Sequence, residues 1–576
     1  MDQMMQRRMS MAAIGTGAGV GLYALYRMAE TEVLTGRLLL VTGALVAVFS
    51  HGLLATVGPL RPMRAALGAL ALAVGVAGLV GIASLRYVQG GTMLISPLAA
   101  PAAVVLALVP LPFWVAQHGP GWRDYRALFS ESWGIVVRMA AGWAFVGVVW
   151  GVILLSDTLL KVVGLTVIGD ILGIAVVPWL ITGGVLGLAL AVVQELSDYV
   201  SPYLVLRLLR LLLPIVVVVT AVFLLALPVR GLSGLFGGLS VALTLLAMVG
   251  AGATLVTTAV DCDDAQATKS TALTWGARAL ALMLPVLAVL AAWSVWLRVQ
   301  QHGWTPERIF AAEVAALGVG YGLFYALAVL RGAGWMARIR TANVSMALAL
   351  MVLAVLTLTP VINAERISSA SQMARLADGR LAVEALEPWL LEGWGRPGAR
   401  ALEDLRAQAA QPGQEALASR LEGIASGSTG TDTREKVLDD LRTGLPVQPE
   451  AATTMRDIYL GSLELYELTS LRDACRTMMP GGGNGCVMVV ADLLPDVPGD
   501  EAVMAERSPS GYVTYLGLSN PGGGVVRHSV SAFGGQVAQY DDGIDQIRRW
   551  QEAPPAVTPA PINQITSREG WLLILP

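Results

Sequence analysis

Eleven long apolar stretches constrain this chain more than any other feature of its sequence. A helix that crosses roughly 30 Å of hydrocarbon needs about 20 apolar residues at ~1.5 Å each. We therefore predict an all-α polytopic membrane bundle of about eleven transmembrane helices over residues 1–363, with an uncleaved first span. The stretches cover approximately residues 9–27, 38–57, 65–84, 93–116, 135–156, 171–194, 208–229, 236–258, 279–297, 309–330 and 341–361.

Charge separates this bundle from the rest of the chain. Residues up to Pro360 include 21 Lys and Arg against 14 Asp and Glu, whereas the remaining residues include 18 against 28. A basic membrane part and an acidic tail indicate two different solvents. The acidic tail argues against nucleic acid as a partner, because phosphate binding needs clustered Lys and Arg. We expect the lipid bilayer as the main partner, with other envelope proteins as further candidates.

The loops also predict an orientation. With a cytoplasmic N-terminus, fourteen Lys and Arg residues of the membrane part fall on the cytoplasmic side and seven on the other side. Cationic loops favour the cytoplasmic face. We therefore predict a multi-pass protein of the bacterial inner membrane whose N-terminus is cytoplasmic. An odd number of spans then places the C-terminal domain in the periplasm.

From about Ala364 the pattern becomes that of a soluble α+β domain. We expect a soluble helical region over residues 364–480 and a small β-rich region over 481–576, with a Pro-rich linker at 554–561. Glycine and proline clusters separate the elements of both regions. The predicted helices cover residues 367–391, 398–409, 412–424, 450–474 and 541–550, and the predicted strands cover 486–492, 502–505, 512–516 and 571–575.

Two of the three cysteines, Cys475 and Cys486, lie in the tail, whereas Cys262 lies in a loop of the membrane part. The segment between the tail cysteines contains Pro480 and several glycines, so it can bring the sulfurs together. We predict a disulfide between them, which requires an oxidising compartment and hence a periplasmic tail. Two reduced, buried thiols are the alternative.

A short motif between the ninth and tenth spans predicts a helix start. Thr305 can accept a hydrogen bond from an early backbone N–H, and Pro306 fits the first helical position. Glu307 then lies at the positive end of the helix. Gly303 and Arg308 flank this start, and we interpret the whole motif as structural.

The same residues resemble a known family. The motif Gly303-x-Thr305-x-x-Arg308 follows an apolar helix that ends in Leu297-Arg298, and two further spans lead to the segment 368–376. This arrangement is similar to the bacterial membrane proteins catalogued as domain of unknown function 4153, and the stretch 208–228 also fits. Two aromatic positions of the family motif are His302 and Ile309 here. The resemblance covers most of residues 200–376; it implies a polytopic inner-membrane protein and no particular activity.

Residue types that could carry chemistry are sparse. Glu313 lies about one turn inside the tenth span, where a charge is costly and often functional, so it is a candidate intramembrane polar site. A structural pairing is the alternative. The four histidines are scattered, and no nucleophile elbow or phosphate loop is complete. An enzyme is therefore the less favoured class.

One acidic segment of the tail could bind a cation. Hard cations such as Ca²⁺ take several oxygen ligands from one tight loop. Calcium is thus a candidate cofactor here, and a plain acidic turn is the favoured interpretation. The candidate ligands are Asp492, Asp496, Asp500 and Glu501.

These observations predict an integral inner-membrane protein that anchors a periplasmic α+β domain for envelope sensing or scaffolding. A transporter of small molecules or ions is the first alternative, because Glu313 lies inside a span. A polytopic membrane enzyme with its site in the tail is the second. No stretch of the sequence identifies a substrate.

Overall fold

The computed structural model divides the chain into two compact units, residues 1–418 and 419–576. The structure describes residues 3–31, 33–34, 36–88, 93–94, 96–195, 202–230, 241–425, 434–477, 479, 483–494, 499–507, 513–520, 525–530, 541–557, 564–566 and 572–574.

In the described part of the first unit, eleven helical segments are long and apolar enough to cross a membrane. Each corresponds to one predicted stretch, so the predicted fold class is confirmed. The fourth span is divided by Pro110 into α4 and α5, because proline cannot donate the helical hydrogen bond at that position. The helices are α1 (Gln3–Glu30), α2 (Gly36–Thr56), α3 (Pro62–Ser84), α4 (Ala99–Leu108), α5 (Pro110–Gln117), α6 (Tyr125–Val162), the short α7 (Val167–Leu172), α8 (Val177–Glu195), α9 (Pro202–Arg230), α11 (Val241–Val260), α12 (Thr271–His302), α13 (Pro306–Leu330) and α14 (Trp335–Leu358).

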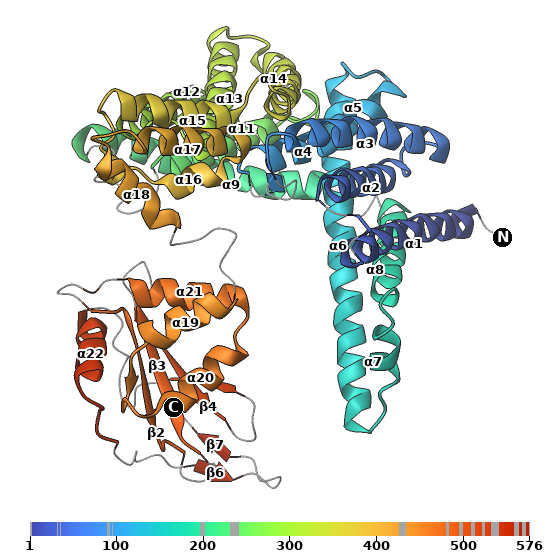
Figure 1. Ribbon diagram of the computed structural model, residues 1–576. Coiled ribbons are helices and arrows are strands. Elements are labelled where there is room, and N and C mark those ends of the chain that lie inside the picture. Colours follow the sequence, from blue (N-terminus) through green and yellow to red (C-terminus); the bar gives the residue numbers. More distant parts are fainter. Residues whose placement is uncertain are drawn as a thin grey trace. The chain divides into compact units, whose positions relative to one another are not determined.

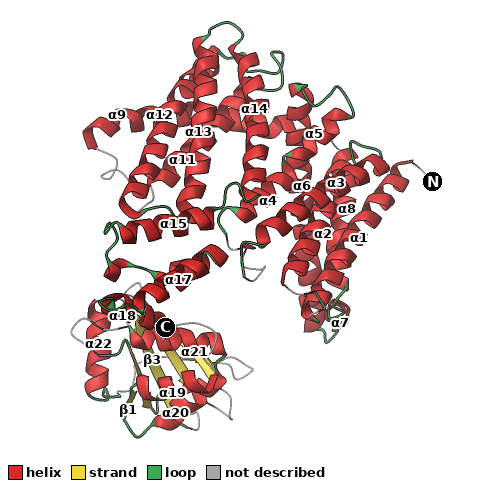
Figure 2. Cartoon of the chain, turned by 45° about the horizontal axis from the view of Figure 1, so that its top comes forward, coloured by secondary structure: helices red, strands yellow, loops and turns green. Residues whose placement is uncertain are grey.

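The spans pack in neighbouring groups. Helix α1 lies along α8 and α2 along α3, while α12 contacts both α11 and α13 (Figure 2). Glycines make the α1–α8 contact possible: a Cβ on Gly15 would lie 2.0 Å from the Gly183 carbonyl oxygen, and one on Gly19 would lie 2.2 Å from that of Trp179. The glycine content of the first span therefore reflects close helix packing.

Helices that follow the last span belong to the first unit. Helix α15 contacts α13, and α17 packs on α15. The backbone N–H of Arg396 donates to the Arg86 carbonyl oxygen, 2.8 Å away, which ties α17 to the end of α3. The boundary of the compact units thus differs from the predicted one at residue 363, because these amphipathic helices pack on the ends of the spans. They are α15 (Ala364–Ala377), the 3-10 helix η2 (Val383–Ala385), α16 (Pro388–Gly393) and α17 (Gly395–Ala409), followed by α18 (Glu415–Ala425).

The second unit contains a five-stranded sheet in the order β1-β2-β3-β4-β5. Strand β1 pairs parallel with β2, and the other neighbours are antiparallel. A separate pair, β6 (Gln564–Thr566) and β7 (Leu572–Ile574), is also antiparallel. The sheet strands are β1 (Val447–Gln448), β2 (Cys486–Ala491), β3 (Glu501–Arg507), β4 (Val513–Ser519) and β5 (Val526–Ser529).

Helices cover both faces of this sheet (Figure 1). Met488 and Val490 of β2 face α19 (Arg434–Gly444), α20 (Thr453–Ser462) and α21 (Leu465–Arg476). Val487 faces α22 (Asp541–Glu552), where it meets Ile547. Strand side chains alternate between faces, so one strand contributes to both cores. The helices α19, α20 and α21, from the predicted helical region, and the strands after residue 480, from the predicted β-rich region, therefore form one α+β fold.

Local differences from the predicted elements have identifiable causes. The helix predicted over 450–474 is two helices, because Glu464 and Glu467 form a capping box that starts α21. The helix predicted over 367–391 ends at Ala377, where the chain turns at Gly379 with φ of 69°. Helix α19 and strands β1, β5 and β6 were not predicted. The loop 427–433 lies outside the described residues, as does the second half of the Pro-rich linker, residues 558–561.

Candidate functional site

The two segments that carry the family resemblance meet in the structure. The turn between α12 and α13 lies against α15, about seventy residues later in the chain. The Ser371 hydroxyl accepts from the Trp304 backbone N–H at 3.0 Å. The Gln372 side chain donates to the carbonyl oxygens of His302 at 3.0 Å and Trp304 at 3.2 Å. Segment 368–376 is thus the docking face for this turn.

Arg375 completes this contact by capping α12. Its guanidinium donates to the carbonyl oxygens of Gln300 at 3.1 Å and Gln301 at 2.6 Å. The last carbonyls of a helix have no partner within the helix and carry the negative end of its dipole. Gly303 follows with φ of 76°, and a Cβ there would lie 2.6 Å from Arg375 Cδ. Only glycine fits this position without displacing the cap.

The start of α13 has the geometry of a capped helix. Thr305 is the N-cap residue, and its hydroxyl accepts from the Arg308 backbone N–H at 3.4 Å. Pro306 occupies the first turn, where its missing N–H costs nothing. The Arg308 side chain turns back and donates to the carbonyl oxygens of Gly303 at 2.8 Å and His302 at 3.3 Å. Arg308 therefore closes the turn with its own side chain, and it lines the same cavity as Gln372 and Arg375 of α15.

Two cavities lie beside this turn, on either side of Leu390 and Trp394. The first has a volume of about 370 Å³ and is bordered by the α12–α13 turn, α15 and the segment 380–394. The second, of about 290 Å³, lies between Tyr87, Ser96 and the start of α16. Both have the size of small-molecule sites.

A buried carboxylate borders the second cavity. Glu365, only 1% exposed, accepts from the hydroxyls of Tyr87 and Ser96, the latter at 3.3 Å. Arg86 Nη1 lies 3.7 Å from Glu365 Oε2, and Arg86 also donates to the Thr357 carbonyl oxygen at the end of α14. Burial raises the pKa of Tyr87, and the Glu365 carboxylate raises it further. The cluster holds the ends of α3 and α14 against α15.

Glu313 is hydrogen-bonded to a residue of a neighbouring span. It is half-buried in α13, and its Oε1 accepts from the Thr357 hydroxyl of α14 at 3.1 Å. A hydrogen bond between neighbouring spans stabilises such a group without a charged partner. The structure therefore places Glu313 in a two-residue contact and not with the Arg308 or Glu307 side chains.

A larger polar network inside the bundle was not predicted. Tyr325, fully buried in α13, hydrogen-bonds to Asn343 of α14 and to Thr257 of α11, the latter at 2.8 Å. Asn343 donates in turn to the Tyr125 hydroxyl of α6 at 2.9 Å. A single asparagine within a span was the available signal. Arg210 also pairs with the buried Asp261, in the loop after α11.

Glu501, the last residue of the acidic segment of the tail, is buried and hydrogen-bonded to the backbone. Its Oε2 accepts from the backbone N–H groups of Leu493 and Leu494 at 2.8 and 2.9 Å. Asp492 and Asp500 are exposed, and Asp496 lies outside the described residues. Among the described residues, no three His, Cys, Asp or Glu side chains gather as a metal site requires. The calcium site stays a prediction.

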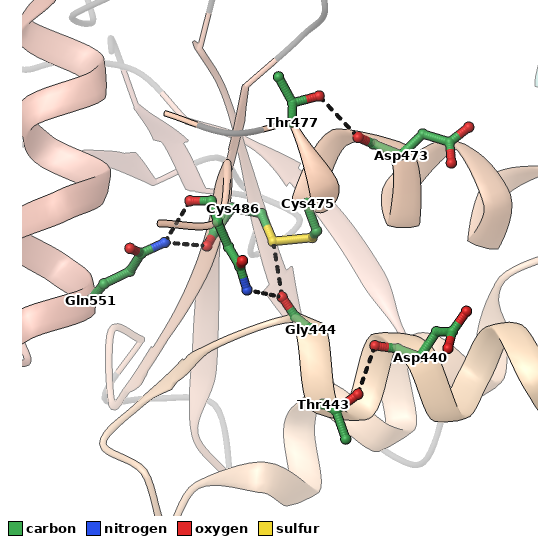
Figure 3. Close-up of a disulfide and its surroundings, with 9 residues drawn as sticks. Asp440, Thr443, Gly444, Asp473, Cys475, Thr477, Cys486 and Gln551 are labelled. Atoms are coloured by element: carbon green, nitrogen blue, oxygen red, sulfur yellow. Dashed lines mark hydrogen bonds between the residues drawn. A yellow bond between two sulfur atoms is a disulfide. The ribbon is translucent and has the colours of Figure 1, made fainter. Parts of the chain in front are cut away.

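Figure 3 shows the disulfide between Cys475, at the end of α21, and Cys486, at the start of β2. Their Cα atoms are 4.7 Å apart, and both residues are buried in the core beneath α19. The Gln551 side chain donates to the Cys486 carbonyl oxygen at 2.8 Å. The bridge therefore joins one helical layer to the sheet, and α22 contacts the same strand from the other face.

A serine and a histidine also meet in this domain. The Ser519 hydroxyl lies 2.7 Å from His528 Nε2, across the β4–β5 pairing. Nucleophilic catalysis needs an accessible hydroxyl and a group that orients the histidine. Ser519 is buried, and no carboxylate among the described residues bonds to His528. This pair connects two strands and does not form a triad.

Comparison with protein-family models, curated proteins and solved structures yields no match. The class of protein is therefore assigned from the fold alone. The chain is an integral membrane protein with eleven candidate spans among its described residues and a C-terminal α+β domain.

Proposed function

We propose that this protein anchors its α+β domain at the periplasmic face of the bacterial inner membrane, where the domain senses or scaffolds other envelope components. The disulfide in the second unit carries the proposal, because such a bond persists in an oxidising compartment. The excess of Lys and Arg in the predicted cytoplasmic loops supports the same orientation. Eleven spans then lead from a cytoplasmic N-terminus to a periplasmic tail.

Thiol alkylation tests the orientation. Membranes are protected from air oxidation, denatured and treated with a mass-shifting thiol reagent before and after reduction. We expect Cys262 alone to react before reduction and all three cysteines after it. Reaction of all three before reduction contradicts both the disulfide and the periplasmic tail. A Cys262→Ser variant provides the control, because it should show no shift until the disulfide is reduced.

Crosslinking in native membranes separates anchoring from transport. An anchor should recover partner proteins that are lost on deletion of residues 419–576, the second compact unit, and kept in Glu313→Ala. Residues 364–409 stay in the deletion variant because they pack on the spans. Partners that survive the deletion would contradict the anchor. If Glu313→Ala abolished the protein's function in cells while the deletion did not, the transporter would be favoured.

We also propose that the chain belongs to the family catalogued as domain of unknown function 4153. The support is that the α12–α13 turn and segment 368–376, which carry the resemblance, contact each other. A structure of an established member of that family tests this: it should show the same turn docked on the helix after the last span. A member whose two segments lie apart would contradict the assignment.

A further inference from the structure

The 370 Å³ cavity beside the α12–α13 turn carries an excess of positive charge. Three arginines line it, Arg308, Arg375 and Arg380, against one acid, Glu387. Arg380 is paired with Asp378 at 2.6 Å. Arg308 and Arg375 donate only to backbone carbonyl oxygens, and no carboxylate among the described residues lies within ion-pair distance of either. Two guanidinium groups thus border the cavity without an ion pair among the described residues, and Glu307 and Glu387 are the acids nearby.

Burial makes a guanidinium group without an ion pair unfavourable when the cavity holds no ligand. Arg375 is 8% exposed, and its Nε is buried with no hydrogen-bond partner. Arg308 uses Nη1 for the turn, which leaves Nε and Nη2 without an acceptor in the described part of the chain. A buried charge without a counter-charge is unfavourable unless a ligand supplies one, and this applies to Arg375, whereas Arg308 is half-buried. An anion in the cavity would bring a counter-charge to both side chains and accept from the N–H groups that Arg308 does not use for the turn.

We propose that this cavity binds the phosphate group of an anionic ligand. Guanidinium groups present planar pairs of donors that match phosphate oxygens, and two of them can hold one phosphate from different sides. The lining also includes Leu390, Leu391 and Trp394, which suit an apolar part of the ligand. The cavity lies where α12 ends and α13 begins, at the ends of two candidate spans, and span ends are where a protein meets lipid headgroups. The phosphate can come from a phospholipid or from a small soluble molecule.

A thermal-shift titration of the full-length, delipidated protein in detergent tests this proposal and distinguishes the sources. The probes are phosphatidylglycerol, inorganic phosphate, and sodium chloride at matched ionic strength. Binding to the folded state raises the unfolding temperature as ligand is added. A response to phosphatidylglycerol alone assigns a lipid headgroup, and a response to inorganic phosphate assigns a free phosphate. A response to neither, or an equal response to sodium chloride, overturns the proposal.

Matched variants locate the site. Arg308→Gln should weaken binding about tenfold or more, because a charge-assisted pair of hydrogen bonds is lost. Arg298→Gln is the control: Arg298 is exposed on the last turns of α12 and does not line the cavity. Equal effects of the two variants would mean that general charge, and no site, is responsible.

A second variant keeps the test decisive if Arg308→Gln does not fold. Arg380 caps no span, so Arg380→Gln should fold, and it should weaken binding roughly two- to fivefold. Unchanged binding in Arg380→Gln overturns the location of the site. This proposal is independent of the anchoring function, since it concerns the first unit alone.

Discussion

Arginine side chains in this protein repeatedly cap the ends of spans on other helices. The C-terminal carbonyls of a helix have no partner within it, and a guanidinium offers them both hydrogen bonds and a complementary charge. Among the described residues, five spans end in this way. The pairs are Arg37 with the end of α3, Arg86 with α14, Arg338 with α13, Arg340 with α11 and Arg375 with α12.

Arg86→Met should be strongly destabilising for this reason. The substitution removes the cap of α14 and leaves the buried Glu365 without its cation, which costs roughly 3–5 kcal/mol. Thermal unfolding in detergent measures the loss, and the exposed Arg366→Met is the matched control. The double variant Arg86→Met/Glu365→Gln should recover part of the stability. A double variant as unstable as Arg86→Met would show that the ion pair is not the cause.

Thr305→Ala should have a smaller, local effect. Loss of the N-cap hydrogen bond to Arg308 N should cost on the order of 1 kcal/mol. The unfolding temperature in detergent should fall while the topology stays the same, and Thr305→Ser should restore it. A normally stable Thr305→Ala protein that has lost function would point to a site in place of a cap.

At the scale of elements, the α1–α8 contact depends on glycines that bring two backbones together. Gly15→Val should lower the unfolding temperature markedly, because its Cβ would lie 2.0 Å from the Gly183 carbonyl oxygen; we expect a cost of about 1–3 kcal/mol or more. Gly17→Val on the same helix meets no atom within 4 Å and serves as the control. Equal stability of the two variants would show that α1 does not dock as described.

The elements themselves were largely predictable, whereas their contacts were not. Because each span needs about 20 consecutive apolar residues, its position can be predicted from local composition alone. The docking of the turn at Gly303 onto Gln372 joins residues about seventy positions apart, and no local pattern encodes it. Likewise, Asn343 is a polar residue within a span, but its own helix does not show that its partners are Tyr325 and Tyr125. The capping box at Glu464 was not predicted, because Leu463 continues an apolar pattern across the break between α20 and α21.

At the scale of the molecule, the α+β unit has its own core on both faces of its sheet. We expect residues 419–576, exported to an oxidising compartment, to fold cooperatively without the spans. Reduction of Cys475–Cys486 should then lower the free energy of unfolding by roughly 2–3 kcal/mol, because the bridge restricts the unfolded chain. Urea unfolding followed by circular dichroism, with and without reductant, measures this. A broad transition in the oxidised domain, or no response to reductant, would contradict the expectation.

The pairing of α1 with α8 also bears on how the bundle is made. A chain grows from its N-terminus at roughly 5–20 residues per second, so α1 enters the bilayer about 10–30 s before α8 exists. Its hydropathy of 1.2 is the lowest among the candidate spans. During that interval, the glycine-rich face of α1 can contact only lipid and the helices that are made before α8. The α1 helix therefore cannot form this interface until α8, five candidate spans later among the described residues, has been made.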